Sequence, residues 1–326
     1  MKFLISQSRR SVMLTATAAI SVAFASPAMA DYPDSSVTVL IPFSAGGGND
    51  QVARAVAERL EERLGQPFVP VNRPGAGGFV AAQELVSGRS DGYTIGHQSL
   101  GTFVLTSLMD DQVVDPLEDL RYVAQVAVLT SAVAVPTDSP YETLEDLLDA
   151  IADSDGGMTW GHTGRGGFHH VNGVSLVRQS GGEARDVPFQ GSSNTRAAML
   201  GGQVDFAILS SLNYIGFEDE MRFLAFLAES EDGLLPDVPT VYDLGHDDMV
   251  TVETPSVWVV PADTPDDVVA TLEAEIEDVV AEEGYREHLL SLGITPLFAS
   301  GDEVRARIDA NIDGWREIIE ATAAEE

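Results

Sequence analysis

A glycine-rich loop between a β-rich run and an amphipathic stretch is the first place where this chain could bind an anion. Val37–Ile41 runs into the sequence PFSAGGGND, which occupies positions 42–50. Apolar residues then recur at helical spacing as far as Leu64, which predicts a helix over Gln51–Leu64. Adjacent glycines let the backbone turn tightly and approach a ligand. A helix N-terminus adds unpaired N–H groups and the positive end of the helix dipole. These residues predict an anion site built mainly from backbone.

The loop does not have the spacing of a nucleotide site. It ends Gly48-Asn49-Asp50, whereas a phosphate-binding P-loop ends in Gly-Lys-Ser or Gly-Lys-Thr. Its glycines do not follow the G-x-G-x-x-G pattern either. Asp50 comes directly before the expected helix and is well placed to cap it. One glycine loop is a weak indicator of function, so the rest of the chain has to decide.

The first thirty residues have the pattern of an export signal. Lys2, Arg9 and Arg10 precede a mildly apolar stretch over residues 12–24, which is too short to span a bilayer. An A-x-A site ends at Ala30, so cleavage is expected after that residue. The paired arginines also fit a twin-arginine signal, and Sec-dependent export is the alternative.

The charge and composition of the expected mature chain limit its function. Without the signal the chain has 15 basic and 52 acidic residues, a formal charge of −37. Such a charge disfavours nucleic-acid binding and indicates a solvated acidic surface like that of proteins from salty environments, with specific cation binding as the alternative. The 44% hydrophobic content is enough for packed cores, and the absence of cysteine excludes disulfides and thiolate metal sites. A mature length of about 296 residues favours two domains.

Strand-like and helix-like segments alternate twice along the chain. The first unit begins at Val37, and the second begins with a strand over Met158–Gly161, followed by a second glycine loop at positions 163–170. A β-rich run over Tyr122–Val135 could cross between the units, and Thr254–Pro261 reads as a return segment. This alternation predicts an α/β fold of two lobes with parallel sheets, in which ligands bind beyond the carboxyl ends of the strands. Two facing lobes would close over a small molecule by a hinge.

Five motifs, in this order, resemble the substrate-binding receptors of tripartite tricarboxylate transporters, also called Bug proteins. They are PFSAGGGND at 42–50, NRPGAGG at 72–78, DGYT at 91–94, GGQVD at 201–205 and LPDVPTVYDLG at 235–245. The resemblance implies a two-lobe periplasmic binding protein fold with a two-segment hinge and a ligand cleft between the lobes. Residues 31–129 plus 254–326 would form lobe 1, and residues 130–253 lobe 2. It also implies a monomeric periplasmic receptor, with no enzymatic activity, metal or cofactor, that delivers a small carboxylate to membrane permease subunits.

The resemblance also places the ligand site. In the family, two glycine loops hold a ligand carboxylate largely through backbone N–H groups and water, and further segments complete the pocket. The residues of this chain expected to bind ligand are Phe43, Ser44, Ala45, Gly46, Gly47, Gly48, Asn49, Asp50, Ser99, Gly101, Thr102, Thr163, Gly164, Arg165, Gly166, Gly167, His169, Gly191 and Ser192. The second loop departs from the family pattern, which is usually small and uncharged, and this leaves the identity of the ligand open.

Several side chains allow two interpretations. Arg165 could bind a ligand carboxylate or pair with an acidic residue at the rim of the cleft. Phe43 and Phe168 could wall the ligand or belong to the core, whereas Trp160 and Trp258 are expected in the core or hinge. Neighbouring residues on a helix point in different directions, so His169 and His170 are not expected to bind one metal ion together.

Two other functions remain as alternatives. One is a receptor for another small anion or a zwitterion. The other is a periplasmic hydrolase, because the segment 96–101 comes within one residue of the G-x-S-x-G nucleophile elbow and would make Ser99 the nucleophile.

Overall fold

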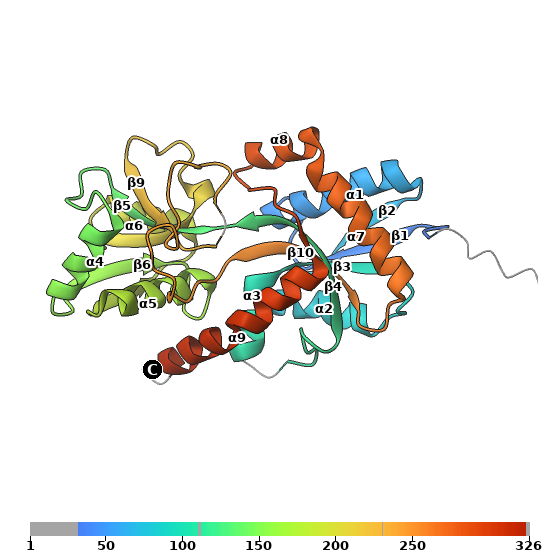
Figure 1. The fold of residues 1–326 in the computed structure, drawn as a ribbon, viewed down its shortest axis with the longest axis horizontal. Helices are drawn as coiled ribbons and strands as arrows, with labels where there is room; N and C mark the ends of the chain where they lie inside the picture. The colour runs from blue at the N-terminus through green and yellow to red at the C-terminus, as the bar shows by residue number, and fades with distance from the viewer. Residues whose placement is uncertain (1–31, 110–111, 230, 324–326) are drawn as a thin grey trace, which may run out of the picture. The chain divides into compact units, whose positions relative to one another are not determined.

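The computed structural model describes residues 32–109, 112–229 and 231–323, whose strands form two separate sheets (Figure 1). The expected signal peptide and its cleavage site lie outside these residues. Within the described ranges, no helix has both the length and the apolar character that a bilayer span requires.

The first sheet has six strands in the order β11-β4-β10-β3-β1-β2. They are β1 (Val37–Ile41), β2 (Phe68–Asn72), β3 (Thr94–Ser99), β4 (Leu120–Leu129), β10 (Thr254–Pro261) and β11 (Ala299–Ser300). Alternating residues of β1 enter opposite cores, because Val39 packs with α1, α7 and α8 whereas Leu40 packs with α2, α3 and α9. Helices therefore cover both faces of this sheet.

The second sheet has five strands in the order β7-β6-β8-β5-β9. They are β5 (Ser131–Pro136), β6 (Met158–His162), β7 (Ala184–Pro188), β8 (Phe206–Ser210) and β9 (Met221–Phe226). Its two cores contain residues of α4 and α5 in one case and of α6 in the other.

The described residues also form α-helices and two short 3-10 turns. They are α1 (Gly48–Leu64), η1 (Ala76–Gly78), α2 (Phe79–Val86), α3 (Leu100–Met109), α4 (Leu144–Asp153), α5 (Phe168–Ser180), α6 (Ser192–Leu200), η2 (Ser211–Asn213), α7 (Asp266–Ala281), α8 (Glu283–Ser291) and α9 (Gly301–Ala323). The predicted start of the first helix at Gln51 was wrong by one turn. Glycine has low helix propensity, but Gly48 stands at the first position, where its N–H needs no intrahelical partner.

The prediction of parallel sheets was correct only in part, because both sheets are mixed. β1, β2 and β3 run parallel, as do β6, β7 and β8. β10 is antiparallel to β3 and β4, and β5 is antiparallel to β8 and β9. The reason is the path of the chain: β4 continues directly into β5 in the other sheet, and β10 returns from it. β5 and β10 each enter their sheet from the side of the other sheet, so each is antiparallel to the strands beside it.

Two crossing segments lie side by side where the chain passes between the sheets. Thr254 is paired with Leu129, and its hydroxyl donates to the Leu129 carbonyl at 2.9 Å. Thr130, between β4 and β5, is buried and donates its hydroxyl to the buried Asp232 carboxylate. The β-rich run at 122–135 therefore does cross from one sheet to the other, as expected.

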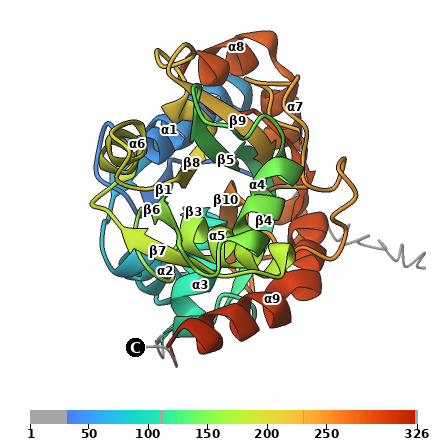
Figure 2. The ribbon, with the colours of Figure 1, turned by 90° about the vertical axis from the view of Figure 1, so that its left-hand side faces the viewer.

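Helix α9 packs on the first sheet and extends beyond it to contact α5 beside the second (Figures 1 and 2). Arg178 of α5 pairs with Glu317 of α9 at 3.5 Å. The buried Asn172 of α5 also exchanges two hydrogen bonds, at 2.9 and 2.7 Å, with the backbone of Val252, just before β10. These contacts fix α5 relative to the first sheet.

Candidate functional site

The first glycine loop, residues 43–50, leads from β1 into α1 and is exposed from Ser44 to Gly48. Gly46 has φ +86°, a conformation that L side chains rarely adopt. Gly47 is the N-cap of α1, with φ −75° and ψ 165° and no side-chain cap. The backbone, and no charged side chain, is therefore what this part of the loop presents to solvent.

Asp50 does not cap α1 as the sequence suggested. It is the third residue of the helix and reaches back, so that the Gly46 N–H donates to Asp50 Oδ2 at 2.8 Å. Arg54 Nε donates to the same oxygen at 2.9 Å, and Asn72 donates to Oδ1 at 2.7 Å. Burial alone would raise the pKa of Asp50, but these hydrogen bonds hold that pKa below its ordinary value. Asp50 is only 2% exposed, and its carboxylate bonds back to the loop at Gly46.

The expected pocket wall lies next to this loop. Ser99 ends β3 and is paired with Ser256 of β10, whose hydroxyl donates to Asn49 Oδ1 at 3.1 Å. Gly101 is buried in the first turn of α3, where an added Cβ would come within 2.5 Å of the Glu253 carbonyl oxygen. Its glycine is therefore required for close packing on the crossing segment. Thr102, on the same turn, is half-buried.

The second glycine loop, residues 163–170, repeats the geometry of the first between β6 and α5. Gly166 has φ +73°, and Gly167 is the N-cap of α5 with φ −77° and ψ 166°. The Gly166 N–H donates to His170 Nδ1 at 3.1 Å, and the Gly164 N–H donates to His162 Nδ1 at 3.2 Å. Met109, the last residue of α3, lies against Gly166. The glycine N–H groups at 164 and 166 are thus used inside the loop itself.

Arg165 pairs with Asp186 of β7, with Nη2 at 2.8 Å from Oδ1. Its side chain is 41% exposed. This contact is the one that the rim interpretation requires. The role of Arg165 toward a ligand stays a prediction.

His169 is buried and lies between two hydroxyls. Its Nδ1 is 2.9 Å from Thr163 Oγ1 and its Nε2 is 3.1 Å from Ser210 Oγ, at the end of β8. Burial, together with the nearby His162, lowers the pKa of His169 to about 3. The neutral ring therefore ties the second loop to β8, and it points its nitrogens at protein groups.

The remaining expected residues lie at neighbouring strand ends. Gly191, with φ +87°, is the N-cap of α6, and Ser192 begins that helix. Phe43 and Phe168 are half-buried and pack against core side chains, which favours the core interpretation of both. Trp160 and Trp258 are 1% exposed and belong to the cores, as expected.

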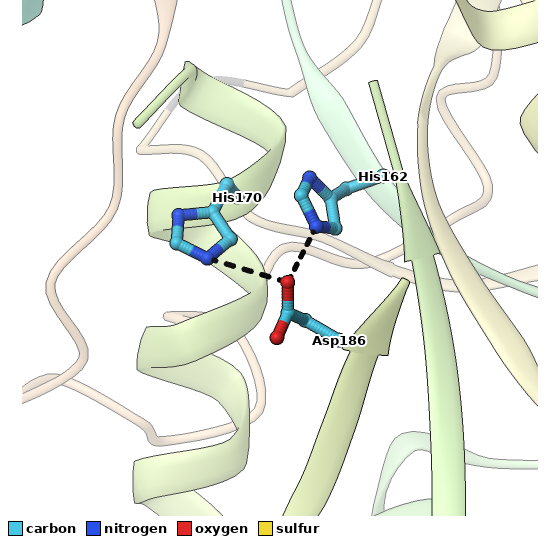
Figure 3. A group of neighbouring side chains, drawn as sticks. All are labelled: His162, His170 and Asp186. Carbon is cyan, nitrogen blue, oxygen red and sulfur yellow. Dashed lines mark hydrogen bonds and ion pairs between the residues drawn. The ribbon is translucent and has the colours of Figure 1, made fainter. Parts of the chain in front are cut away.

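Three side chains with metal-binding atoms gather beneath the second loop: His162, His170 and Asp186, whose candidate ligand atoms lie within 4.8 Å of one another (Figure 3). Asp186 Oδ2 is 3.0 Å from His162 Nε2 and 3.9 Å from His170 Nε2. Because both Nδ1 atoms accept backbone N–H groups, the ring protons must stand on the Nε2 atoms. A neutral imidazole that binds a metal through Nε2 carries its proton on Nδ1 and usually donates it. The arrangement is therefore that of a hydrogen-bond network.

The sequence argument missed His162 and Asp186. His162 ends β6 directly before the loop, and Asp186 lies within β7. β6 and β7 pair in parallel, with Trp160 opposite Asp186. His162 pairs with Pro188, so Asp186 lies diagonally across from His162, two residues before its direct partner. A correct strand register would have identified the pair.

The hydrolase alternative has no support at Ser99. His97 precedes it on β3, and neither ring nitrogen of His97 has a hydrogen-bond partner among the described residues. His169 does contact a serine hydroxyl, but its other nitrogen meets Thr163 and no carboxylate. A Ser-His-acid arrangement requires that third group to orient the imidazole.

Comparisons with known proteins agree with this structure. Residues 52–323 match the tripartite tricarboxylate transporter family receptor. The chain is 28% identical to the UPF0065 protein in the gbd 5′ region of Cupriavidus necator, over 95% of both chains. A TctC solute-binding protein from Polaromonas, solved without ligand, superposes with a TM-score of 0.81 at 24% identity, over 89% of this chain and 99% of that one. MatC from Rhodopseudomonas palustris, solved with bound malate, gives a TM-score of 0.65 at 24% identity, over 88% and 100%.

The match over most of the chain, the two-sheet architecture and the paired glycine loops lead to one assignment. This chain belongs to the tripartite tricarboxylate transporter receptors, a family of periplasmic solute-binding proteins with the two-lobe fold.

Proposed function

We propose that this chain captures a small carboxylate between its two glycine loops and delivers it to the membrane permease subunits of a tripartite transporter. The observation that carries the proposal is the repeated loop. Gly47 and Gly167 begin α1 and α5 with the same extended backbone, each after a glycine in the left-handed region. The first-turn N–H groups of both helices are the natural donors to a carboxylate.

The side chains of the first loop favour recognition through the backbone. Its exposed part, Ser44–Gly48, contains serine, alanine and glycines and no cation. The nearby charged group, Asp50, is buried and already bonded to Gly46, Arg54 and Asn72. A receptor built this way fixes a carboxylate with oriented dipoles and gains affinity when the site closes and water is excluded. Malate, the acid bound to MatC, is a suitable first probe.

A thermal-shift screen of the mature protein tests the proposal. Malate, other di- and tricarboxylates, monocarboxylates, amino acids and phosphate are compared at equal concentration. A carboxylate that binds raises stability by about 2.7 kcal/mol at a hundredfold excess over its Kd. The diamide of the same acid is the matched control, because it keeps the shape and loses the charge. Equal shifts with acid and diamide, or shifts confined to phosphate or amino acids, would reject the carboxylate assignment.

We further propose that the mature protein begins at Asp31, is exported to the periplasm, acts as a monomer and binds its solute without chemical change. Mass spectrometry of periplasmic extracts gives the N-terminus, and light scattering gives the mass in solution. Recovery of the bound acid unchanged after denaturation tests for turnover. Steady conversion of an ester substrate, lost in Ser99→Ala, would instead support the hydrolase alternative.

A further inference from the structure

The two glycine loops share one hydrogen-bond arrangement, in which a glycine N–H donates to a side chain four residues later. The accepting group differs between the loops. In the first loop, the N–H of Gly46 donates to a side chain four residues later, Asp50, at 2.8 Å. In the second, the N–H of Gly166 donates to a side chain four residues later, His170, at 3.1 Å. Both acceptors are the third residue of the following helix, and each is 2% exposed.

On the neighbouring strand, each acceptor side chain has a second polar partner: a donor for Asp50 and a carboxylate for His170. Asn72 ends β2, the parallel neighbour of β1, and donates to Asp50 Oδ1 at 2.7 Å. Asp186 is on β7, the parallel neighbour of β6, and its carboxylate faces His170 Nε2 at 3.9 Å (Figure 3). A carboxylate acceptor needs a donor behind it. An imidazole accepts through Nδ1 only while its proton stays on Nε2, and a carboxylate beside Nε2 favours that tautomer.

We propose that Asp50 and His170 are equivalent positioning residues that hold the two glycine loops in their ligand-binding shape, with Asp186 fixing the tautomer of His170. The inference rests on the proposed function for the ligand but not for the loop geometry. Each acceptor satisfies an N–H at a glycine in the left-handed region, where the chain reverses into the helix. Without it, that N–H loses its partner and the turn loses the contact that selects its conformation.

The hydrogen bonds within the loops determine which backbone N–H groups remain for a ligand. The N–H groups of Gly46, Gly164 and Gly166 are committed to side chains and do not serve the ligand. Contacts to a carboxylate fall to the N–H groups of the first helical turns, at Gly48 and Asn49 in α1 and at Phe168 and His169 in α5. The second loop has an additional tie, because His162 holds Gly164 and donates its own Nε2–H to Asp186 at 3.0 Å.

Matched substitutions distinguish the effect of losing the hydrogen-bond acceptor from the effect of changing side-chain packing. In His170→Asn the side-chain oxygen is attached to Cγ, as Nδ1 is, and can still accept the Gly166 N–H. In His170→Leu the volume is kept and the acceptor is lost. Asp50→Asn keeps one acceptor oxygen that can still accept the Gly46 N–H, and Asp50→Leu removes the acceptor. The exposed His288 of α8 provides the control substitution His288→Leu.

The first readout is amide hydrogen exchange, which needs no ligand. We expect exchange at Gly166 to become about tenfold faster in His170→Leu and to stay within about threefold of wild type in His170→Asn. Gly46 should respond in the same way to the Asp50 pair. Equal exchange in the Asn and Leu variants would overturn the proposal. Long-range nitrogen–proton spectra of His170 should show a bare Nδ1 and a protonated Nε2, and the opposite tautomer would also overturn it.

The second readout is affinity for malate by calorimetry. We expect each Leu variant to bind about tenfold more weakly and each Asn variant to recover most of the loss. If malate does not bind the wild-type protein, the carboxylate proposal fails there while the exchange experiment still decides the positioning roles. Zinc alone is the final arm. A groove of about 400 Å³, lined in part by His170, Asp186 and Arg165, gives ions access to the cluster. Zinc that stabilises the wild-type protein but not His162→Leu would make the cluster a metal site and overturn the assigned role of His170.

Discussion

Gly47 and Gly167 have nearly the same backbone conformation, φ −75°, ψ 165° and φ −77°, ψ 166°, at the N-caps of α1 and α5. Any residue can adopt these angles, so the backbone itself does not require glycine at either position. An added Cβ would come no closer than 3.6 Å to the Ser44 carbonyl at position 47, and 3.4 Å to the Gly164 carbonyl at position 167. Under the proposed function, glycine at these positions leaves space for a ligand beside the helix N-terminus.

Gly47→Val is expected to abolish carboxylate binding in a protein that stays folded, because the branched side chain would occupy the approach to the first-turn N–H groups. Asn49→Ala should weaken the free energy of carboxylate binding by about 1 kcal/mol, the contribution of one hydrogen bond. Calorimetry measures binding, and circular dichroism checks the fold. Gly284→Val, on α8 with no neighbour closer than 3.9 Å, is the control. Normal binding by Gly47→Val would place the site elsewhere.

Arg165→Ala is expected to change the free energy of carboxylate binding by less than about 0.5 kcal/mol, because its guanidinium is partly exposed and already pairs with Asp186. A titration of the variant and the wild type under the same salt conditions measures the difference. A loss of about 2 kcal/mol or more would show that the side chain reaches the ligand as a charge-assisted donor, and would correct the rim interpretation.

His97→Leu is expected to stabilise the protein at pH 5. His97 is fully buried without a hydrogen-bond partner among the described residues, and burial lowers its pKa to about 3, with nearby Asp50 acting weakly in the opposite direction. The unfolded chain has a histidine pKa near 6.5, so it binds a proton that the folded state does not. The free energy of unfolding is therefore not reduced by His97 titration above about pH 6.5, and it falls as the pH drops from there toward the folded pKa.

Urea unfolding at pH 7.5, 6 and 5 measures this effect. The difference in unfolding free energy between His97→Leu and wild type should grow as the pH falls. A constant difference across the series would mean that the pKa of His97 in the folded protein equals that in the unfolded chain.

Carboxylate affinity is expected to rise between low salt and about 1 M salt. The mature chain would have a formal charge of −37, so at long range it repels its own ligand. The Debye length falls from about 30 Å at 0.01 M to about 3 Å at 1 M, so salt removes that repulsion and spares the short-range N–H contacts. The same screening should relieve repulsion among surface carboxylates and stabilise the fold.

Stopped-flow and calorimetric titrations across this salt range, with the fold checked at each step, test the expectation. Association should become faster with salt. Affinity that falls steadily in a protein that remains folded would show that a cationic pocket dominates, and that recognition through backbone N–H groups is wrong.

The sequence by itself determined the class of this protein. Five ordered motifs, strand–glycine–helix patterns and apolar spacing depend on neighbours within a few residues, so they identified the family, the two α/β units and the core positions of Trp160 and Trp258. The crossing of the chain after Leu129 was also visible as one unbroken β-rich run. Local patterns could not give strand direction, because the antiparallel β5 and β10 are set by the path between the sheets.

Only the tertiary structure decided what the polar side chains do. Asp50 looked like a helix cap, but the helix begins at Gly48 and the carboxylate instead binds Gly46 and Asn72. His170 looked like half of an adjacent pair with His169, yet its partners are Gly166 and the more distant Asp186. Hydrogen bonds between side chains remote in sequence depend on the register of neighbouring strands. A shift of one residue turns each side chain to the opposite face of the sheet, and local sequence patterns do not fix that register.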